Sequence, residues 1–219
     1  MVSRQACFAG RPPLYFPESI HTTDKEPKRW RRFWEDEGLA PDEVGYEKNI
    51  RDLSDLDRVE ELTSHPKLRV AGIVVDKVDR IMHGMELGTA GMHNQVRQWG
   101  EQGVLASLLD MLLEREFAVF LTADHGNIEA AGCGRPSEGA LADLRGERAR
   151  IFNDASLRTR VHARFPDAVD WPPIGLPIDY LALLAPHRAA FVREGEKLVG
   201  HGGITVEEVI VPLVRIERK

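Results

Sequence analysis

Cysteine is scarce in this chain of 219 residues: only Cys7 and Cys133 occur, and they form neither a CxxC pair nor another metal-binding spacing. This excludes a cysteine-based metal site of the usual kind and favours a reducing compartment. Long apolar runs are also absent, since none approaches the roughly 18–20 residues that span a membrane. We therefore expect no membrane span and no signal peptide, and we predict a cytoplasmic location.

The chain has no excess of positive charge either. Its 29 Lys and Arg residues are outnumbered by 35 Asp and Glu residues, which gives a net charge of −6. Non-specific electrostatic binding of nucleic acid needs a basic face, so this charge balance argues against such binding. It does not exclude a local basic groove. With 42% apolar residues the chain has a real core, and its length fits one large domain over residues 1–219.

Two short apolar segments, Leu68–Val75 and residues 117–122, predict buried strands. Between them a helical pattern runs from about Asn94 to Arg115, with its leucines on one face. A strand, a helix and a strand at this spacing form a βαβ unit, in which the two strands are parallel. The sequence therefore predicts an α/β fold whose sheet is at least partly parallel.

Aromatic residues, which make up 7% of the chain, are concentrated in an amphipathic helix expected over residues 28–34. Trp30, Phe33 and Trp34 share one face of that helix. Such a face either packs against the core or an interface, or offers a stacking platform for nucleotides. We favour packing.

The remaining segments predict a short helix, a long loop and a further strand and helix. A short helix is expected over 54–64, with Ser54 as its N-cap. Residues 126–150 are rich in glycine and arginine and predict a long loop, and the wider stretch 126–186 is expected to contain long loop insertions. A strand and a helix are predicted within 147–160.

Acid and imidazole side chains follow three of the predicted strands. Asp79 and His83 form a D-x-x-x-H pair just past the first strand, Asp124 and His125 come directly after the second, and His201 follows a later one. In a parallel sheet such residues converge at one edge. A set of carboxylate and imidazole ligands suits zinc, manganese or iron, and contains too much nitrogen for calcium.

Each cluster also has an ordinary structural interpretation. An Asp–His pair after a strand can be a turn, a D-x-x-x-H spacing occurs by chance in many helices, and His201 between glycines can be a flexible turn. Their joint appearance, in order and at strand ends, favours a shared site. Asp76 is a rival ligand to Asp79. Lys77 and Arg80 are candidate phosphate contacts, although a solvated charge is the simpler role for both.

The ordered set of D-x-x-x-H, DHG and HGG, followed by an acidic helix and a Val-Pro strand, resembles the alkaline phosphatase superfamily. Within it, the chain is similar to PglZ-domain proteins of the bacterial BREX phage-defence systems. The resemblance rests on residues 2–10, 82–88, 122–127 and 201–212. It implies an alkaline-phosphatase-like α/β fold with a mostly parallel central sheet flanked by helices, and other defence-system proteins as partners.

The resemblance also implies a two-metal phosphohydrolase for phosphomonoesters or phosphodiesters, nucleotide and nucleic acid included. Asp79, His83 and His201 would hold one divalent ion, and Asp124 and His125 would hold the other. Zinc is favoured, with manganese as the alternative. Ions roughly 4 Å apart would stabilise both the attacking and the leaving oxygen of an in-line displacement at phosphorus.

The chain departs from the superfamily pattern at its N-terminus. The superfamily's nucleophilic Ser or Thr precedes the segment that matches residues 2–10, and a metal-binding Asp lies further upstream. We therefore expect the domain to lack its N-terminal part, to be inactive or impaired as a hydrolase, and to expose apolar sheet edges. Ser3 is the only nearby substitute nucleophile. The alternative is a non-catalytic metal-binding assembly module of a defence complex.

Overall fold

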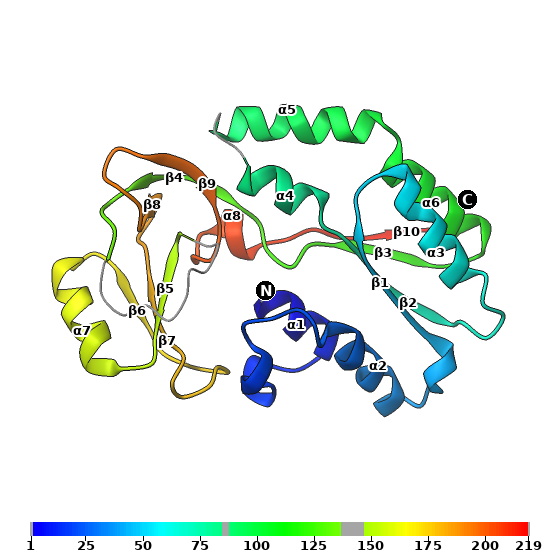
Figure 1. Cartoon of the computed structure of the whole chain (residues 1–219), viewed down its shortest axis with the longest axis horizontal. Helices are drawn as coiled ribbons and strands as arrows, with labels where there is room; N and C mark the ends of the chain where they lie inside the picture. Colours follow the sequence, from blue (N-terminus) through cyan, green and yellow to red (C-terminus); the bar gives the residue numbers. More distant parts are fainter. Residues whose placement is uncertain (1, 85–87, 137–146, 219) are drawn as a thin grey trace.

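The computed structural model describes residues 2–84, 88–136 and 147–218, and its elements are labelled in Figure 1. The helices in these ranges are α1 (Val2–Ala9), α2 (Glu26–Asp36), α3 (Leu56–Thr63), α4 (Lys77–His83), α5 (Gly88–Glu101), α6 (Val104–Glu114), α7 (Ala155–Arg164) and α8 (Val206–Val209). The strands are β1 (Val44–Ile50), β2 (Val70–Val75), β3 (Val119–Thr122), β4 (Ile128–Gly132), β5 (Ala149–Phe152), β6 (Val169–Trp171), β7 (Leu181–Leu184), β8 (Ala189–Ala190), β9 (Lys197–Gly200) and β10 (Leu213–Ile216).

The architecture is mixed α/β, but the hydrogen-bonded sheets are small and mixed in direction. Strands β1 and β2 pair in parallel, β3 and β10 pair antiparallel, and two three-stranded sheets have the orders β8-β4-β9 and β5-β7-β6. The expected mostly parallel central sheet is therefore not seen in the described ranges. Strand β3 was predicted to be parallel to β2, but its hydrogen-bonding partner is β10, with Thr122 opposite Leu213. An apolar run predicts a strand without specifying its partner or direction.

The main apolar core lies between the β1–β2 pair and helices α3, α5 and α6. Its fully or nearly fully buried members are Ile50, Leu56, Val59, Trp99, Val104, Leu108 and Leu112. The helix predicted over 94–115 is two helices, because Gly103 adopts a positive φ of 79° that ends α5 and lets α6 start in a new direction. The indole of Trp99 donates a hydrogen bond to the carbonyl of Arg51 at 2.7 Å, which ties α5 to the end of β1.

The aromatic face of α2 is half-buried and packs against α1 and β1. Trp30 meets Phe8 of α1 edge-on at 5.4 Å between ring centroids, and its indole donates to the Gly45 carbonyl at 2.7 Å. Phe33 and Trp34 extend the same aromatic cluster. This arrangement supports packing, rather than nucleotide stacking, as the role of this face.

A second group of elements, on the left of Figure 1, is built around β5, β6, β7 and α7. Its core consists of Phe152, Val161, Ala168, Leu183, Ala185 and Phe191. Helix α7 begins at its N-cap Asp154, whose carboxylate accepts a hydrogen bond from the Leu157 amide at 2.8 Å. The strand and helix predicted within 147–160 are thus present. Part of the loop predicted over 126–150 is strand β4, whereas residues 137–146 of it lie outside the described residues.

Several apolar side chains of the β3–β10 pair are open to solvent. Phe120 is 62% exposed and Leu213 is 74% exposed, and Leu121 and Val214 beside them are also exposed. Sheet surface of this kind is usually covered in folded proteins. No helix in the described ranges is both long enough and apolar enough to cross a membrane.

Candidate metal centre

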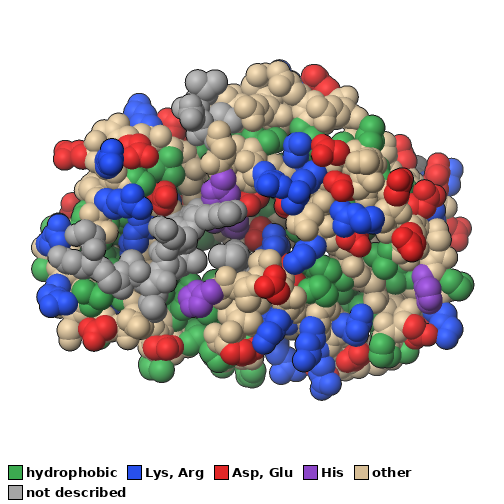
Figure 2. Space-filling model, in the orientation of Figure 1, with side chains coloured by type: hydrophobic (Ala, Val, Ile, Leu, Met, Phe, Trp, Pro, Cys, Tyr) green, Lys and Arg blue, Asp and Glu red, His purple; other side chains and the backbone are tan. Residues whose placement is uncertain are grey.

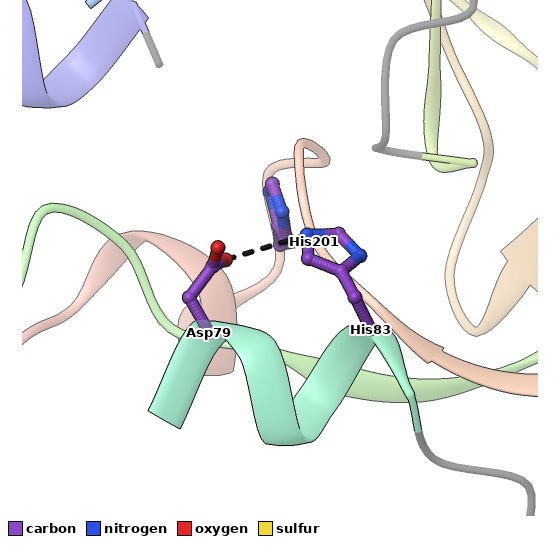
Figure 3. A group of neighbouring side chains, drawn as sticks. All are labelled: Asp79, His83 and His201. Atoms are coloured by element: carbon purple, nitrogen blue, oxygen red, sulfur yellow. Dashed lines mark ion pairs between the residues drawn. The ribbon is translucent and has the colours of Figure 1, made fainter. Parts of the chain in front are cut away.

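Three side chains that could hold a metal ion lie close together (Figure 3). Asp79 and His83 project from α4, and His201 follows β9. One ligand atom from each lies within 4.8 Å of the other two. Residues four apart lie on the same side of a helix, and the carboxylate of Asp79 is 3.3 Å from Nε2 of His83. The set offers one oxygen and two nitrogen ligands.

The rival acid, Asp76, has a different role. Its carboxylate accepts hydrogen bonds from Arg51 Nε at 2.8 and 3.1 Å and from Arg51 Nη2 at 2.8 Å. This fork joins the end of β1 to the start of α4 and leaves Asp79 as the acid that faces the histidines. Lys77 forms an ion pair with Asp52 at 3.3 Å, and Arg80 is exposed. Nothing in these contacts supports a phosphate-binding role for either cation.

Of the three side chains, His201 carries the clearest sign of a metal-binding role. Its Nε2 atom is buried and has no hydrogen-bond partner among the described residues. Burial, followed by the neighbouring His125 and His83, lowers the pKa of His201 from 6.5 to about 3, so the ring is neutral at pH 7. A buried, unpartnered nitrogen is costly unless something binds it.

The protonation states of the cluster suit a cation. The hydrogen bond with His83 is the main cause that lowers the pKa of Asp79, so its carboxylate is ionised at neutral pH. A metal site needs ionised carboxylates and neutral imidazoles, and Asp79 and His201 are in these states. Three protein ligands of this kind also match a catalytic zinc site, which keeps a fourth position for water or substrate. The residues present therefore fit a divalent metal.

Asp124 and His125 lie beside this group without joining it. The ring of His125 stacks on that of His201, with 3.9 Å between centroids and 17° between planes. Asp124 is 3.8 Å from His125 Nε2 and lies on the side of α1, where its charge, after burial, raises the pKa of the Cys7 thiol. Ser3 is exposed in the first turn of α1. The structure thus brings His125 to His201 and leaves Asp124 close enough to α1 for its charge to act on Cys7.

Two residues that contact the loops carrying His125 and His201 were not identified from the sequence. Glu208 in α8 and Arg148, just before β5, form an ion pair with side chains 1% and 0% exposed. Glu208 had a local signal in the sequence, because Thr205-x-x-Glu208 is a capping-box pattern at the start of α8. No local signal links Arg148 to Glu208, because Arg148 lies 60 residues earlier in the chain.

The low pKa of His201 predicts a pH effect on the metal-free protein. An unfolded histidine has a pKa of 6.5, whereas folded His201 has about 3, so between these values the unfolded state binds a proton that the folded state does not. The free energy of unfolding should therefore fall as the pH is lowered from 6.5 towards 3. Urea unfolding in chelator across this range would measure it.

The variant His201→Asn should reduce the dependence of the free energy of unfolding on pH in this range, because it removes the titrating group. The matched control is His65→Asn, since His65 is exposed beyond α3. An equal slope in wild type and His201→Asn would contradict the assignment of the low pKa to His201.

The mixed α/β architecture, with an Asp–His–His group formed by α4 and the loop after β9, is consistent with an alkaline-phosphatase-like domain. The family model described as the BREX system PglZ alkaline phosphatase-like domain matches residues 1–216, which is nearly the whole chain. The chain therefore belongs to the PglZ family, and the resemblance seen in its motifs is confirmed. A comparison with curated proteins found no match.

Proposed function

We propose that this PglZ domain is a divalent-metal-dependent phosphohydrolase domain that acts on phosphomonoesters or phosphodiesters. The observation that carries the proposal is the group of Asp79, His83 and His201, with the buried Nε2 of His201 lacking any partner in the described ranges. A bound ion would act as a Lewis acid on a phosphoryl oxygen and favour an ionised nucleophile. Zinc suits two imidazoles and one carboxylate best, and manganese is the alternative.

The chain's own residues would prepare this site in a defined way. Asp79 would supply a negatively charged oxygen, and His83 and His201 would supply imidazole nitrogens. Asp124 and His125, next to the group, are the proposed ligands of a second ion. The substrate is a phosphoester, with nucleotides and nucleic acids in that class, and the partners are other proteins of the BREX system.

A non-catalytic metal-binding assembly module is the second candidate. It is favoured by one observation, the position of the candidate nucleophile. Ser3 is the candidate hydroxyl for catalysis, and it is exposed on α1. Loss of turnover in Ser3→Ala would assign the nucleophile to Ser3, and unchanged turnover would remove it from the proposal.

Metal loading followed by ester turnover tests the two functions. The hydrolase proposal predicts that chelator-treated protein takes up Zn²⁺ or Mn²⁺ and hydrolyses p-nitrophenyl phosphate or bis-p-nitrophenyl phosphate, whereas the assembly-module alternative predicts uptake without turnover. His201→Ala should weaken metal affinity by at least about 100-fold, since even changes that only support a ligand cost 10–100-fold. The control is His65→Ala, an exposed histidine beyond α3 that is not part of the cluster.

Each outcome separates the candidates. Metal uptake with turnover supports the hydrolase. Metal uptake without turnover of either ester rejects the hydrolase and supports the assembly module. A wild-type protein that takes up neither metal rejects both.

A further inference from the structure

Among the ion pairs of the described residues, the pair of Arg148 and Glu208 is the most deeply buried, and it lies against the loop that carries His201. Nε and Nη2 of Arg148 donate to the two carboxylate oxygens of Glu208 at 3.0 and 2.8 Å. Both side chains are essentially inaccessible to solvent, at 0% and 1% exposed. Burying two charges is expensive, and a pair of similar-sized apolar residues often serves stability equally well. The pair therefore calls for an explanation beyond stability.

The carboxylate of Glu208 also holds the loop that carries His201. It accepts hydrogen bonds from the Gly203 amide at 2.8 Å and from the amide and hydroxyl of Thr205 at 3.2 and 2.9 Å. The bonds to Thr205 cap α8, but those to Gly203 and Arg148 reach outside the helix. A Cβ atom at Gly203 would lie 2.6 Å from both Arg148 Nη2 and Glu208 Oε2, so the loop runs directly against the pair.

The backbone of Glu208 contacts the loop that carries His125. The Gly126 amide donates to the Glu208 carbonyl at 2.8 Å. Glu208 therefore contacts both histidine loops, one through its side chain and the other through its carbonyl oxygen. The two loops meet where the rings of His125 and His201 stack, with centroids 3.9 Å apart.

We propose that Glu208, oriented by Arg148, is a positioning residue that fixes the His201 and His125 loops relative to each other. Its side-chain hydrogen bonds to Gly203 and Thr205 restrict the loop that follows His201, the residue that this loop brings to Asp79 and His83. The effect on metal affinity rests on the proposed function. The effect on ring geometry does not, because the loops meet in the metal-free protein.

The variant Glu208→Gln tests this with little change of shape. A glutamine has one acceptor oxygen and a donor group, so it cannot accept all five hydrogen bonds, and its amide would face donors of Arg148 or Gly203. We expect Zn²⁺ affinity, measured by competition with a chromophoric chelator, to fall by about 10–100-fold. The matched control is Glu207→Gln, because Glu207 pairs with Arg188 at the surface, with side chains 47% and 64% exposed.

A second variant separates positioning from folding. The double change Arg148→Met and Glu208→Leu removes both charges together, so that no buried charge is left alone. We expect its unfolding midpoint to stay near that of wild type while the Zn²⁺ affinity falls as in Glu208→Gln. Wild-type affinity in this folded double variant would overturn the proposal.

Histidine ring NMR of the metal-free proteins makes the test independent of metal binding. We expect the ring resonances of His125 and His201 to move in Glu208→Gln and in the double variant, and to stay in place in Glu207→Gln. Unmoved rings would overturn the proposal. If wild type binds no Zn²⁺ but the rings move, the proposed function fails while the positioning role of Glu208 stands.

Discussion

Replacing Gly126 by alanine is expected to lower the free energy of unfolding by about 3 kcal/mol or more, at the upper end of overpacking substitutions. A Cβ atom at this position would lie 1.9 Å from the carbonyl oxygen of Glu207 and 3.0 Å from its carbonyl carbon. These are backbone atoms, which cannot move aside as the end of a flexible side chain can. The loop of His125 would have to leave α8, and the stacking on His201 would be lost with it.

Urea unfolding of Gly126→Ala measures this cost, and Gly100→Ala is the matched control. Gly100 lies inside α5 with no heavy atom within 4 Å of its Cβ position. Alanine there should stabilise the protein by about 0.5–1 kcal/mol, since glycine is a poor helix former. A Gly126→Ala protein as stable as wild type would show that α8 does not press against this loop.

The change Arg148→Met alone is expected to destabilise the protein by about 3–5 kcal/mol. It leaves the carboxylate of Glu208 buried without its cationic partner, with only Gly203 and Thr205 to donate to it. Most of the loss should be recovered when Glu208→Leu is added, because the uncompensated charge is then gone. Chemical unfolding of the single and double variants measures this coupling.

The exposed ion pair of Arg188 and Glu207 provides the comparison for the buried pair of Arg148 and Glu208. Arg188 and Glu207 are 2.7 Å apart but largely exposed, so Arg188→Met should leave the free energy of unfolding nearly unchanged. Equal effects of Arg148→Met and Arg188→Met would mean that burial of the Arg148 pair contributes nothing to its strength.

Elements with strong local signals were predictable from the sequence. The aromatic spacing of Trp30, Phe33 and Trp34 identified α2 and the face that packs, and the apolar run 68–75 identified β2. Asp79 and His83 followed from their spacing, because residues four apart share a side of a helix. The break at Gly103 was missed, since a single glycine within a helical pattern does not show whether the chain turns there.

Features that depend on distant contacts were not predictable in the same way. The apolar run of β3 did not reveal its antiparallel partner β10. His201 was expected to reach Asp79 across one edge of a parallel sheet, but β9 belongs to a separate sheet with β4. The two ligand loops come together over α8, and Arg148, which orients Glu208, comes from another part of the chain. No spacing rule connects such residues.

The surface charges agree with the balance of the sequence. Acidic and basic side chains are interspersed over the face shown in Figure 2, and histidines come to the surface near its middle. The mixed charge over the described part of this face does not produce a broad positive field.

An ion held by α4 and by the loop after β9 would join points of the chain about 120 residues apart. In the unfolded chain, closing so long a loop costs entropy, as it does for a disulfide. In the folded chain the ends are already together, so the ion would act as a reversible crosslink between the two sides of the molecule. Removing it with a chelator would then loosen the junction between these sides first, while the apolar core around Trp99 stayed intact.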